Sequence, residues 1–309
     1  NLPRVKDVET MIKLLESMGS KVEISKNKNS LVIKNDKKIK TEASYNLMST
    51  MRAGIIVLGP LLARFGKARV SSPGGCNIGF RPIDIHLEAL KKMGVKYKII
   101  DGYINANAKN GLVGAKIKFP KISVGATENL MIAACLAKGQ TVLSNCAIEP
   151  EIKDLSNFLC SIGAKIVWTG RRQVKIVGVK TFKQSSYKIM FDRIEAGTML
   201  IAGAINQGNL KITGIESSIL KTEIDLLKKI GAKINQKKNE ITIKGNKKIK
   251  NINIKTSPFP GVATDIQAQL MVLLCKANKR STIKEDIFEN RFQSVPELKR
   301  MNAKIEVKG

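Results

Sequence analysis

The segment SSPGGCNIGFRP, Ser71 to Pro82, places one cysteine behind two glycines and five residues before an arginine. Two adjacent glycines free the backbone for positive φ, so the segment is expected to be an exposed loop. A cation near an exposed thiol lowers the thiol pKa, which makes Cys76 beside Arg81 a candidate reactive group. For an isolated cysteine, an incidental loop thiol is the simpler interpretation.

The other four cysteines lie in apolar helical or strand segments and are predicted to pack in the core: Cys135, Cys146, Cys160 and Cys275. No CxxC spacing occurs and the number of cysteines is odd, which argues against a disulfide framework and a zinc site. The single histidine, His86, excludes a metal site with several histidines. We therefore expect no metal site and a reducing cytoplasm.

The segment FPKISVGATEN, Phe119 to Asn129, is typical of an anion cradle. Lys121 offers charge, Ser123 a hydroxyl, and residues 124–126 backbone N–H groups just ahead of the expected helix ENLMIAACLA. Helix N-termini with small residues bind phosphate groups. A serine and glycine at a helix start are common, however, so this segment alone identifies no ligand.

The stretch RPIDIHLEAL predicts a helix that Pro82 opens and that carries Asp84 in its first turn. His86 then follows as a partly buried polar side chain. Taken singly, Asp84 is a helix-start residue.

Two later segments also deliver charged groups to helix starts or turns. SPFPGVATDIQAQL brings Asp265 to the start of an apolar helix, where capping of that helix is the simpler interpretation. FENRFQSVPELKRM brings Arg291 next to Glu289 and Glu297, so a salt bridge to one of them is the simpler expectation there.

A repeat of about seventy residues positions these groups. One marker, an amphipathic helix followed by a turn residue and an alternating strand, has its turn residue at Gly19, Gly94, Gly163, Gly231 and Asn302. Glycine and asparagine suit the left-handed helix C-cap. A second marker lies between these, an apolar helix ending near Gly66, Gly139, Gly208 and Asn278 and then a short strand.

Short alternating segments at 31–35, 103–106, 173–178 and 240–245 add hairpin strands to each unit. The unit is thus helix, strand, helix, strand, which predicts an α/β (α+β) fold with helices packed behind mixed sheets. The repeat register puts a domain boundary near residues 187–197. We expect a first domain over 1–189 and a second over 190–309.

The 309 residues carry 54 Lys and Arg against 25 Asp and Glu, a formal net charge of +29. This charge could mark a nucleic-acid partner, but many of the lysines fall at expected hairpin turns, and aromatic residues make up only 5%. Stacking platforms for single-stranded nucleic acid need more aromatic residues. No apolar run approaches a membrane span. We therefore predict neither a nucleic-acid partner nor a membrane association.

Five segments closely resemble, in the same order, segments of the UDP-N-acetylglucosamine enolpyruvyl transferase family: GGCNIGFRPIDIH, KISVGATEN, DRIEAGT, TDIQAQ and FENRFQSVPELKRM. The resemblance implies the enolpyruvyl-transferase fold, two inside-out α/β barrel domains built from βαβαββ units. It implies transfer of the enolpyruvyl group of phosphoenolpyruvate to the 3-hydroxyl of UDP-N-acetylglucosamine, with release of phosphate, in peptidoglycan synthesis. A cytoplasmic bacterial monomer without a cofactor is expected.

The resemblance also implies residue roles. Cys76 would be the general acid and the site of alkylation by fosfomycin, Arg81 would contact the phosphate of phosphoenolpyruvate, and Asp265 would be the base for the sugar hydroxyl. The remaining positions would bind substrate: Arg52, Pro82, Ile83, Asp84, Ile85, Lys121, Ile122, Ser123, Val124, Ile287 and Arg291.

Six repeat units of this family would need roughly forty residues before Asn1 and a longer stretch after Gly309. Two other functions stay open at this point. One is the sibling transferase acting on shikimate 3-phosphate, which uses no loop cysteine and needs no nucleotide cradle. The other is a non-catalytic basic repeat protein that binds RNA.

Overall fold

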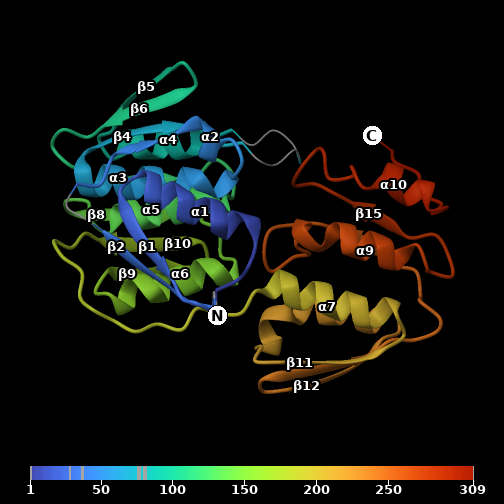
Figure 1. The fold of residues 1–309 in the computed structure, drawn as a ribbon. Coiled ribbons are helices and arrows are strands. Elements are labelled where there is room, and N and C mark those ends of the chain that lie inside the picture. Colours follow the sequence, from blue (N-terminus) through green and yellow to red (C-terminus); the bar gives the residue numbers. More distant parts are fainter. Residues whose placement is uncertain (1, 28, 36–37, 75–77, 79–81, 309) are drawn as a thin grey trace. The chain divides into compact units, whose positions relative to one another are not determined.

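The computed structural model describes residues 2–27, 29–35, 38–74, 78 and 82–308. These residues form two compact units, each drawn in Figure 1. The first unit holds the described residues up to 74 together with 82–187, and the second holds Ile78 and 188–308.

The described residues of the first unit form helices and strands in alternation. Its helices are α1 (Lys6–Ser17), α2 (Tyr45–Met48), the 3₁₀ helix η1 (Arg52–Val57), α3 (Leu58–Phe65), α4 (Asp84–Lys92), α5 (Val124–Ala134) and α6 (Pro150–Ser161). Its strands are β1 (Ser20–Ile24), β2 (Leu31–Asn35), β3 (Glu42–Ala43), β4 (Lys67–Ser71), β5 (Lys96–Ile100), β6 (Tyr103–Asn107), β7 (Lys116–Lys118), β8 (Gln140–Ser144), β9 (Lys165–Gly170) and β10 (Gln173–Val177).

The second unit continues the same alternation. Its helices are α7 (Arg193–Ile205), η2 (Ser217–Leu220), α8 (Lys221–Lys229), η3 (Thr264–Ile266), α9 (Gln267–Leu274) and α10 (Val295–Arg300). Its strands are β11 (Asn209–Thr213), β12 (Lys233–Lys237), β13 (Glu240–Lys244), β14 (Asn253–Lys255) and β15 (Thr282–Lys284).

The sheets confirm the internal repeat. Two sheets of the first unit have the same construction, β3-β4-β6-β5 and β7-β8-β10-β9. In each, the first pair is parallel and the other two pairs are antiparallel. In the second unit, β11-β13-β12 is antiparallel and β14 pairs with β15 in parallel. The strands expected at 31–35, 103–106, 173–178 and 240–245 are present as β2, β6, β10 and β13.

The turn residues of the first marker all take positive φ, as the helix C-cap interpretation predicts: Gly19 at 104°, Gly94 at 91°, Gly163 at 103°, Gly231 at 108° and Asn302 at 65°. The second marker is less regular. Gly66 and Gly139 have positive φ, but at the third copy the left-handed residue is Gln207 and not Gly208.

Helices that are apolar on all sides lie at the centre of each unit, because such helices are stable only when surrounded. In the first unit α5 packs against η1, α3, α4 and α6 and against β8 and β10, and Leu130 and Met131 are fully buried. In the second unit α7 packs against α8, α9, β11 and β13. Of these two central helices, α5 carries candidate residues at its start, at 121–124.

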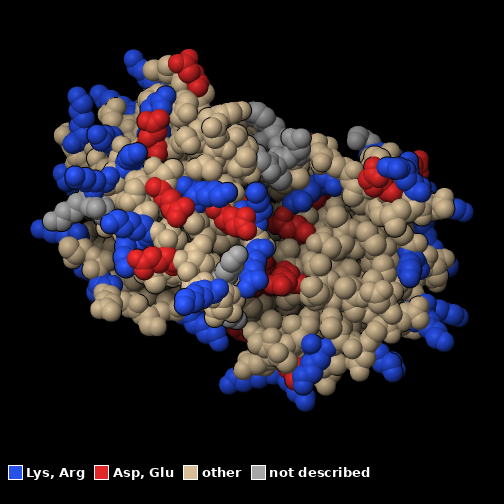
Figure 2. Space-filling view, viewed as in Figure 1, with Lys and Arg blue, Asp and Glu red and all other residues tan. Residues whose placement is uncertain are grey.

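Lysine and arginine side chains are spread over the visible face of the first unit, with acidic side chains between them, and lie mainly around the rim of the second unit (Figure 2). Lys238, in the turn between β12 and β13, is exposed, as expected for a charge at a hairpin turn. None of the helices in the described part of the chain is long and apolar enough to cross a membrane.

Candidate active site

The helix start expected at the candidate anion cradle is present as the N-terminus of α5, with one correction. The helix begins at Val124, and the Ser123 hydroxyl caps it by accepting a hydrogen bond from Ala126 N at 3.3 Å. The Ala126 N–H is therefore already bonded, so Val124 and Gly125 supply the first-turn N–H groups that face outward. Lys121 is exposed and Ile122 is half-buried just before the cap. This end of α5 can bind an anion.

The segment before α4 lies in the same unit. The helix begins at Asp84, which is exposed, and Pro82 lies two residues before it. Ile83 is half-buried. The Ile85 side chain is 7% exposed and belongs to the core, so only its backbone is available to a ligand.

Arg52 begins η1 and is half-buried. Its positive charge acts on His86, whose pKa is lowered to about 4, first by burial and then by Arg52. His86 is 4% exposed, which is more buried than the sequence suggested. The charges of Arg52 and of Asp84, at the start of α4, thus both act on the His86 imidazole.

In the second unit the structure pairs the two charged residues that the sequence singled out. Arg291 Nη2 donates to Asp265 Oδ1. The Arg291 side chain is 19% exposed and that of Asp265 is 55% exposed, so the carboxylate remains open to solvent. The arginine is ion-paired as expected, but its partner is neither Glu289 nor Glu297.

Asp265 does not cap the apolar helix, so that simpler interpretation is wrong. It lies within η3, and the N-cap of α9 is Ile266, without a side-chain cap bond. The Asp265 carboxylate is used for the Arg291 pair instead.

A chain of hydrogen bonds fixes the Arg291 side chain. The sequence did not reveal this chain. Arg291 Nε donates to Thr264 Oγ1 at 3.1 Å, and Thr264 Oγ1 donates to Glu285 Oε2 at 2.9 Å. Glu285 Oε1 accepts from the backbone N–H groups of Ile287 at 2.8 Å and Phe288 at 3.2 Å. The Glu285 carboxylate therefore fixes both the guanidinium and the backbone at Ile287, which is half-buried.

Cys76 and Arg81 lie outside the described residues. On one side of them, Gly74 N donates to Met48 O at 3.0 Å in the first unit. Within the second unit, Asn290 N donates to Ile78 O at 3.0 Å. Ile78 is thus bonded to the residue directly before Arg291.

The prediction for the other cysteines is half correct. Cys135 and Cys146 are buried, and burial raises the pKa of each thiol to about 12. Cys160 and Cys275 are exposed, because each lies at the end of its helix on the side that faces solvent. Local apolarity of the sequence could not distinguish these two sides.

Glu128, in α5, carries a pH-dependent effect on stability. Burial, and after it the carboxylates of Glu151 and Glu149, together raise its pKa to about 7. The folded-state pKa exceeds the unfolded one, so the stabilising contribution is complete below about pH 4.5 and is lost as pH rises through about 7, by up to about 3 kcal/mol.

We therefore expect Glu128→Gln to match the parent protein in unfolding free energy at pH 4.5 and to exceed it at pH 8. Urea denaturation at both pH values measures this. Glu16→Gln, at an exposed position of α1, is the control and should show no pH-dependent difference. Equal stability of Glu128→Gln and the parent at pH 8 would contradict the prediction.

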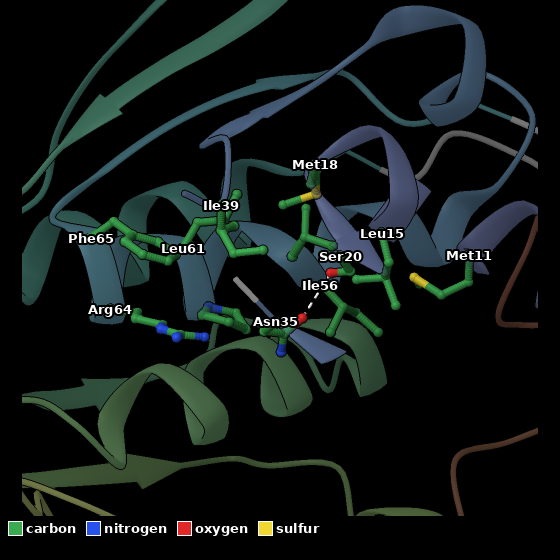
Figure 3. Close-up of a pocket in the computed structure, with 12 residues that line it drawn as sticks. Met11, Leu15, Met18, Ser20, Asn35, Ile39, Ile56, Leu61, Arg64 and Phe65 are labelled. Atoms are coloured by element: carbon green, nitrogen blue, oxygen red, sulfur yellow. Dashed lines mark hydrogen bonds between the residues drawn. The ribbon is translucent and has the colours of Figure 1, made fainter. Parts of the chain in front are cut away.

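A cavity of about 250 Å³ lies elsewhere in the first unit, between α1, η1 and α3 (Figure 3). Its lining is mostly apolar, with Met11, Leu15 and Phe65 around it and Arg64 at one end. None of the described candidate site residues lines it. The cavity is therefore separate from the candidate active site.

Comparison with known proteins identifies the family. The family model described as EPSP synthase (3-phosphoshikimate 1-carboxyvinyltransferase) matches residues 1–309. A UDP-N-acetylglucosamine 1-carboxyvinyltransferase of Pelagibacter ubique is 69% identical over 309 residues, which is all of this chain and 74% of that protein. One from Trichlorobacter lovleyi is 47% identical over 309 residues, all of this chain and 73% of that protein.

Solved structures agree on the fold. The enolpyruvyl transferase NikO from Streptomyces tendae superposes with a TM-score of 0.83 at 21% identity, covering 96% of this chain and 71% of that one. An EPSP synthase from Acinetobacter baumannii gives 0.66 at 15% identity, covering 91% and 66%. The predicted enolpyruvyl-transferase fold is confirmed, and the chain belongs to the EPSP synthase family and, within it, to the UDP-N-acetylglucosamine 1-carboxyvinyltransferases.

Proposed function

We propose that the candidate residues of both units serve one reaction, the transfer of the enolpyruvyl group of phosphoenolpyruvate to the 3-hydroxyl of UDP-N-acetylglucosamine. The 69% identity over the whole chain to a transferase of that name supports this most directly. The reaction is the first committed step of peptidoglycan synthesis. The bacterial cytoplasm and a monomeric state are parts of the same proposal.

The first unit would bind the nucleotide sugar. Its diphosphate is an anion, and the start of α5 offers N–H groups, the helix dipole and Lys121. Arg52 adds a second cation. Pro82, Ile83 and the Ile85 backbone would contact the uridine together with Asp84. The geometry of the described residues is compatible with each of these roles.

The second unit would act on the sugar hydroxyl. Asp265 Oδ2 is left for a ligand because Oδ1 bonds Arg291, so the carboxylate can accept the proton of the 3-hydroxyl while the arginine fixes its orientation. The sugar oxygen then bonds to C2 of phosphoenolpyruvate. Ile287 would contact the sugar, and its backbone is held by Glu285.

Cys76 would supply the proton that C3 of phosphoenolpyruvate gains as C2 is attacked, which gives a tetrahedral intermediate. Loss of a proton from C3 then restores the double bond as the bond between C2 and the phosphate oxygen breaks. Arg81 would stabilise the charge of the phosphate group that leaves. Every atom is accounted for by the two substrates, and no cofactor is needed.

The sibling reaction on shikimate 3-phosphate is disfavoured by comparison. The EPSP synthase structures are 15% and 16% identical, whereas the relatives that act on the nucleotide sugar by name are 45% to 69% identical. The anion cradle at α5 also suits a diphosphate.

The test is phosphate release from phosphoenolpyruvate by the polypeptide as its gene encodes it, with UDP-N-acetylglucosamine, with shikimate 3-phosphate and with neither. We expect release only with the nucleotide sugar and its loss after treatment with fosfomycin. Release with shikimate 3-phosphate alone would overturn the assignment in favour of the sibling reaction. No release with either acceptor from a folded protein would overturn the proposed activity.

A further inference from the structure

A buried pair of polar side chains lies beneath the candidate nucleotide-sugar site of the first unit. His86 is 4% exposed and Asn129 is fully buried. Asn129 Nδ2 lies 3.1 Å from His86 Nδ1. The two residues are far apart in the sequence, one in α4 and one in α5, and the proposed reaction uses neither.

The hydrogen bonds of Asn129 determine how this pair is protonated. Its Oδ1 accepts from Gly59 N at 2.7 Å, and its Nδ2 donates to Ile55 O at 3.0 Å. The second amide hydrogen is left for His86 Nδ1, which must accept it. The imidazole is therefore neutral with its proton on Nε2, consistent with its pKa of about 4.

The opposite edge of the imidazole faces the first turn of α5. A Cβ atom at Gly125 would lie 3.5 Å from His86 Cε1 and 3.7 Å from Nε2, so the ring lies against the backbone of the anion cradle. A Cβ atom at Gly59 would approach Asn129 Oδ1 to 2.2 Å, so that position requires glycine for the N–H to reach the amide. The pair is closely enclosed on both sides.

Three segments meet at this pair. Ile55 belongs to η1, which begins with Arg52. His86 follows residues 82–85, and Asn129 belongs to α5, whose start carries residues 121–124. Each segment carries candidate substrate-binding residues at its start. A buried polar group that loses its hydrogen bond destabilises the fold, so displacement of any one segment is opposed through the shared hydrogen bonds.

We propose that His86 and Asn129 are positioning residues that hold these three segments in the arrangement that binds the nucleotide sugar. The pair acts through Arg52 and the starts of α4 and α5 and does not touch substrate. This inference rests on the proposed function for its ligand, UDP-N-acetylglucosamine. The linkage between the segments is a property of the protein alone and can be tested separately.

The test uses two substitutions at one position. Asn Oδ1 can replace an imidazole Nδ1 acceptor, whereas Phe fills the ring volume and removes it. In the full-length protein we expect His86→Phe to raise KM for UDP-N-acetylglucosamine about tenfold or more, with kcat and KM for phosphoenolpyruvate within about threefold. His86→Asn should recover most of the lost affinity.

Leu90→Ala is the matched control, because Leu90 is fully buried in α4 and its side chain has no polar atom. It should lower the melting temperature at least as much as His86→Phe without changing the ratio of the two KM values. An unchanged KM for the nucleotide sugar in folded His86→Phe would overturn the proposal. So would a parallel loss of all kinetic parameters in both variants, since that indicates general destabilisation.

Amide hydrogen exchange without substrate separates this proposal from the assigned function. His86→Phe should accelerate exchange by about tenfold or more in residues 52–59 and 124–129, and Leu90→Ala should not. Unchanged exchange in both segments would overturn the linkage whatever the enzyme binds. Failure of the unsubstituted protein to bind UDP-N-acetylglucosamine would instead overturn the function and leave the exchange result to decide the linkage.

Discussion

Asp265→Asn is expected to lower kcat for phosphate release by about 10²- to 10⁴-fold, the usual contribution of a positioned general base. The amide keeps the size of the side chain and can still accept from Arg291, but it cannot take the proton of the sugar hydroxyl. KM for UDP-N-acetylglucosamine should change much less. Steady-state kinetics with both substrates varied measures the two effects.

Asp225→Asn is the control for this change, since Asp225 is an exposed carboxylate on α8 of the same unit. It should retain the kcat of the parent protein. If Asp265→Asn kept kcat within threefold, Asp265 would not be the base, and the ion pair with Arg291 would be structural only.

Cys76→Ala is expected to lower kcat by a similar factor, about 10²- to 10⁴-fold, because it removes the acid that protonates C3 of phosphoenolpyruvate. The variant should also gain no mass on treatment with fosfomycin. Phosphate release and intact-protein mass spectrometry give the two readouts.

Cys160→Ala provides a thiol control, because Cys160 is exposed but lies on α6. It should keep full activity and still gain one fosfomycin adduct. Full activity of Cys76→Ala would remove the thiol from the mechanism, and an adduct that persists in that variant would place the reactive thiol elsewhere.

The sequence was most informative where structure depends on nearest neighbours in the chain. The C-cap residues Gly94 and Gly163 and the hairpin strand at 240–245 follow from backbone preferences and alternation, which act over a few residues. The roles of the candidate residues follow from likeness to a family. Their types alone left Asp265 as a helix cap.

The parts that sequence could not predict depend on pairing between distant residues. Arg291 had acidic neighbours in the chain, yet it pairs with Asp265, 26 residues away. The hydrogen bonds that link Glu285 through Thr264 to Arg291 depend on how the segment after β15 packs against η3. Asn129 is one signal of a buried hydrogen-bond network, because an amide in an apolar helix needs hydrogen-bond partners. The sequence does not show that one of its partners is His86, which is 43 residues away.

The two matching repeats of the first unit share one core, which has a consequence for folding cooperativity. Each sheet is completed within its own repeat, since β3 joins β4, β5 and β6, and β7 joins β8, β9 and β10. The repeats are coupled through α5, which packs against η1, α3 and α4 of the preceding repeat, and the buried apolar residues of both belong to one cluster. The first unit is therefore expected to unfold in a single step and not repeat by repeat.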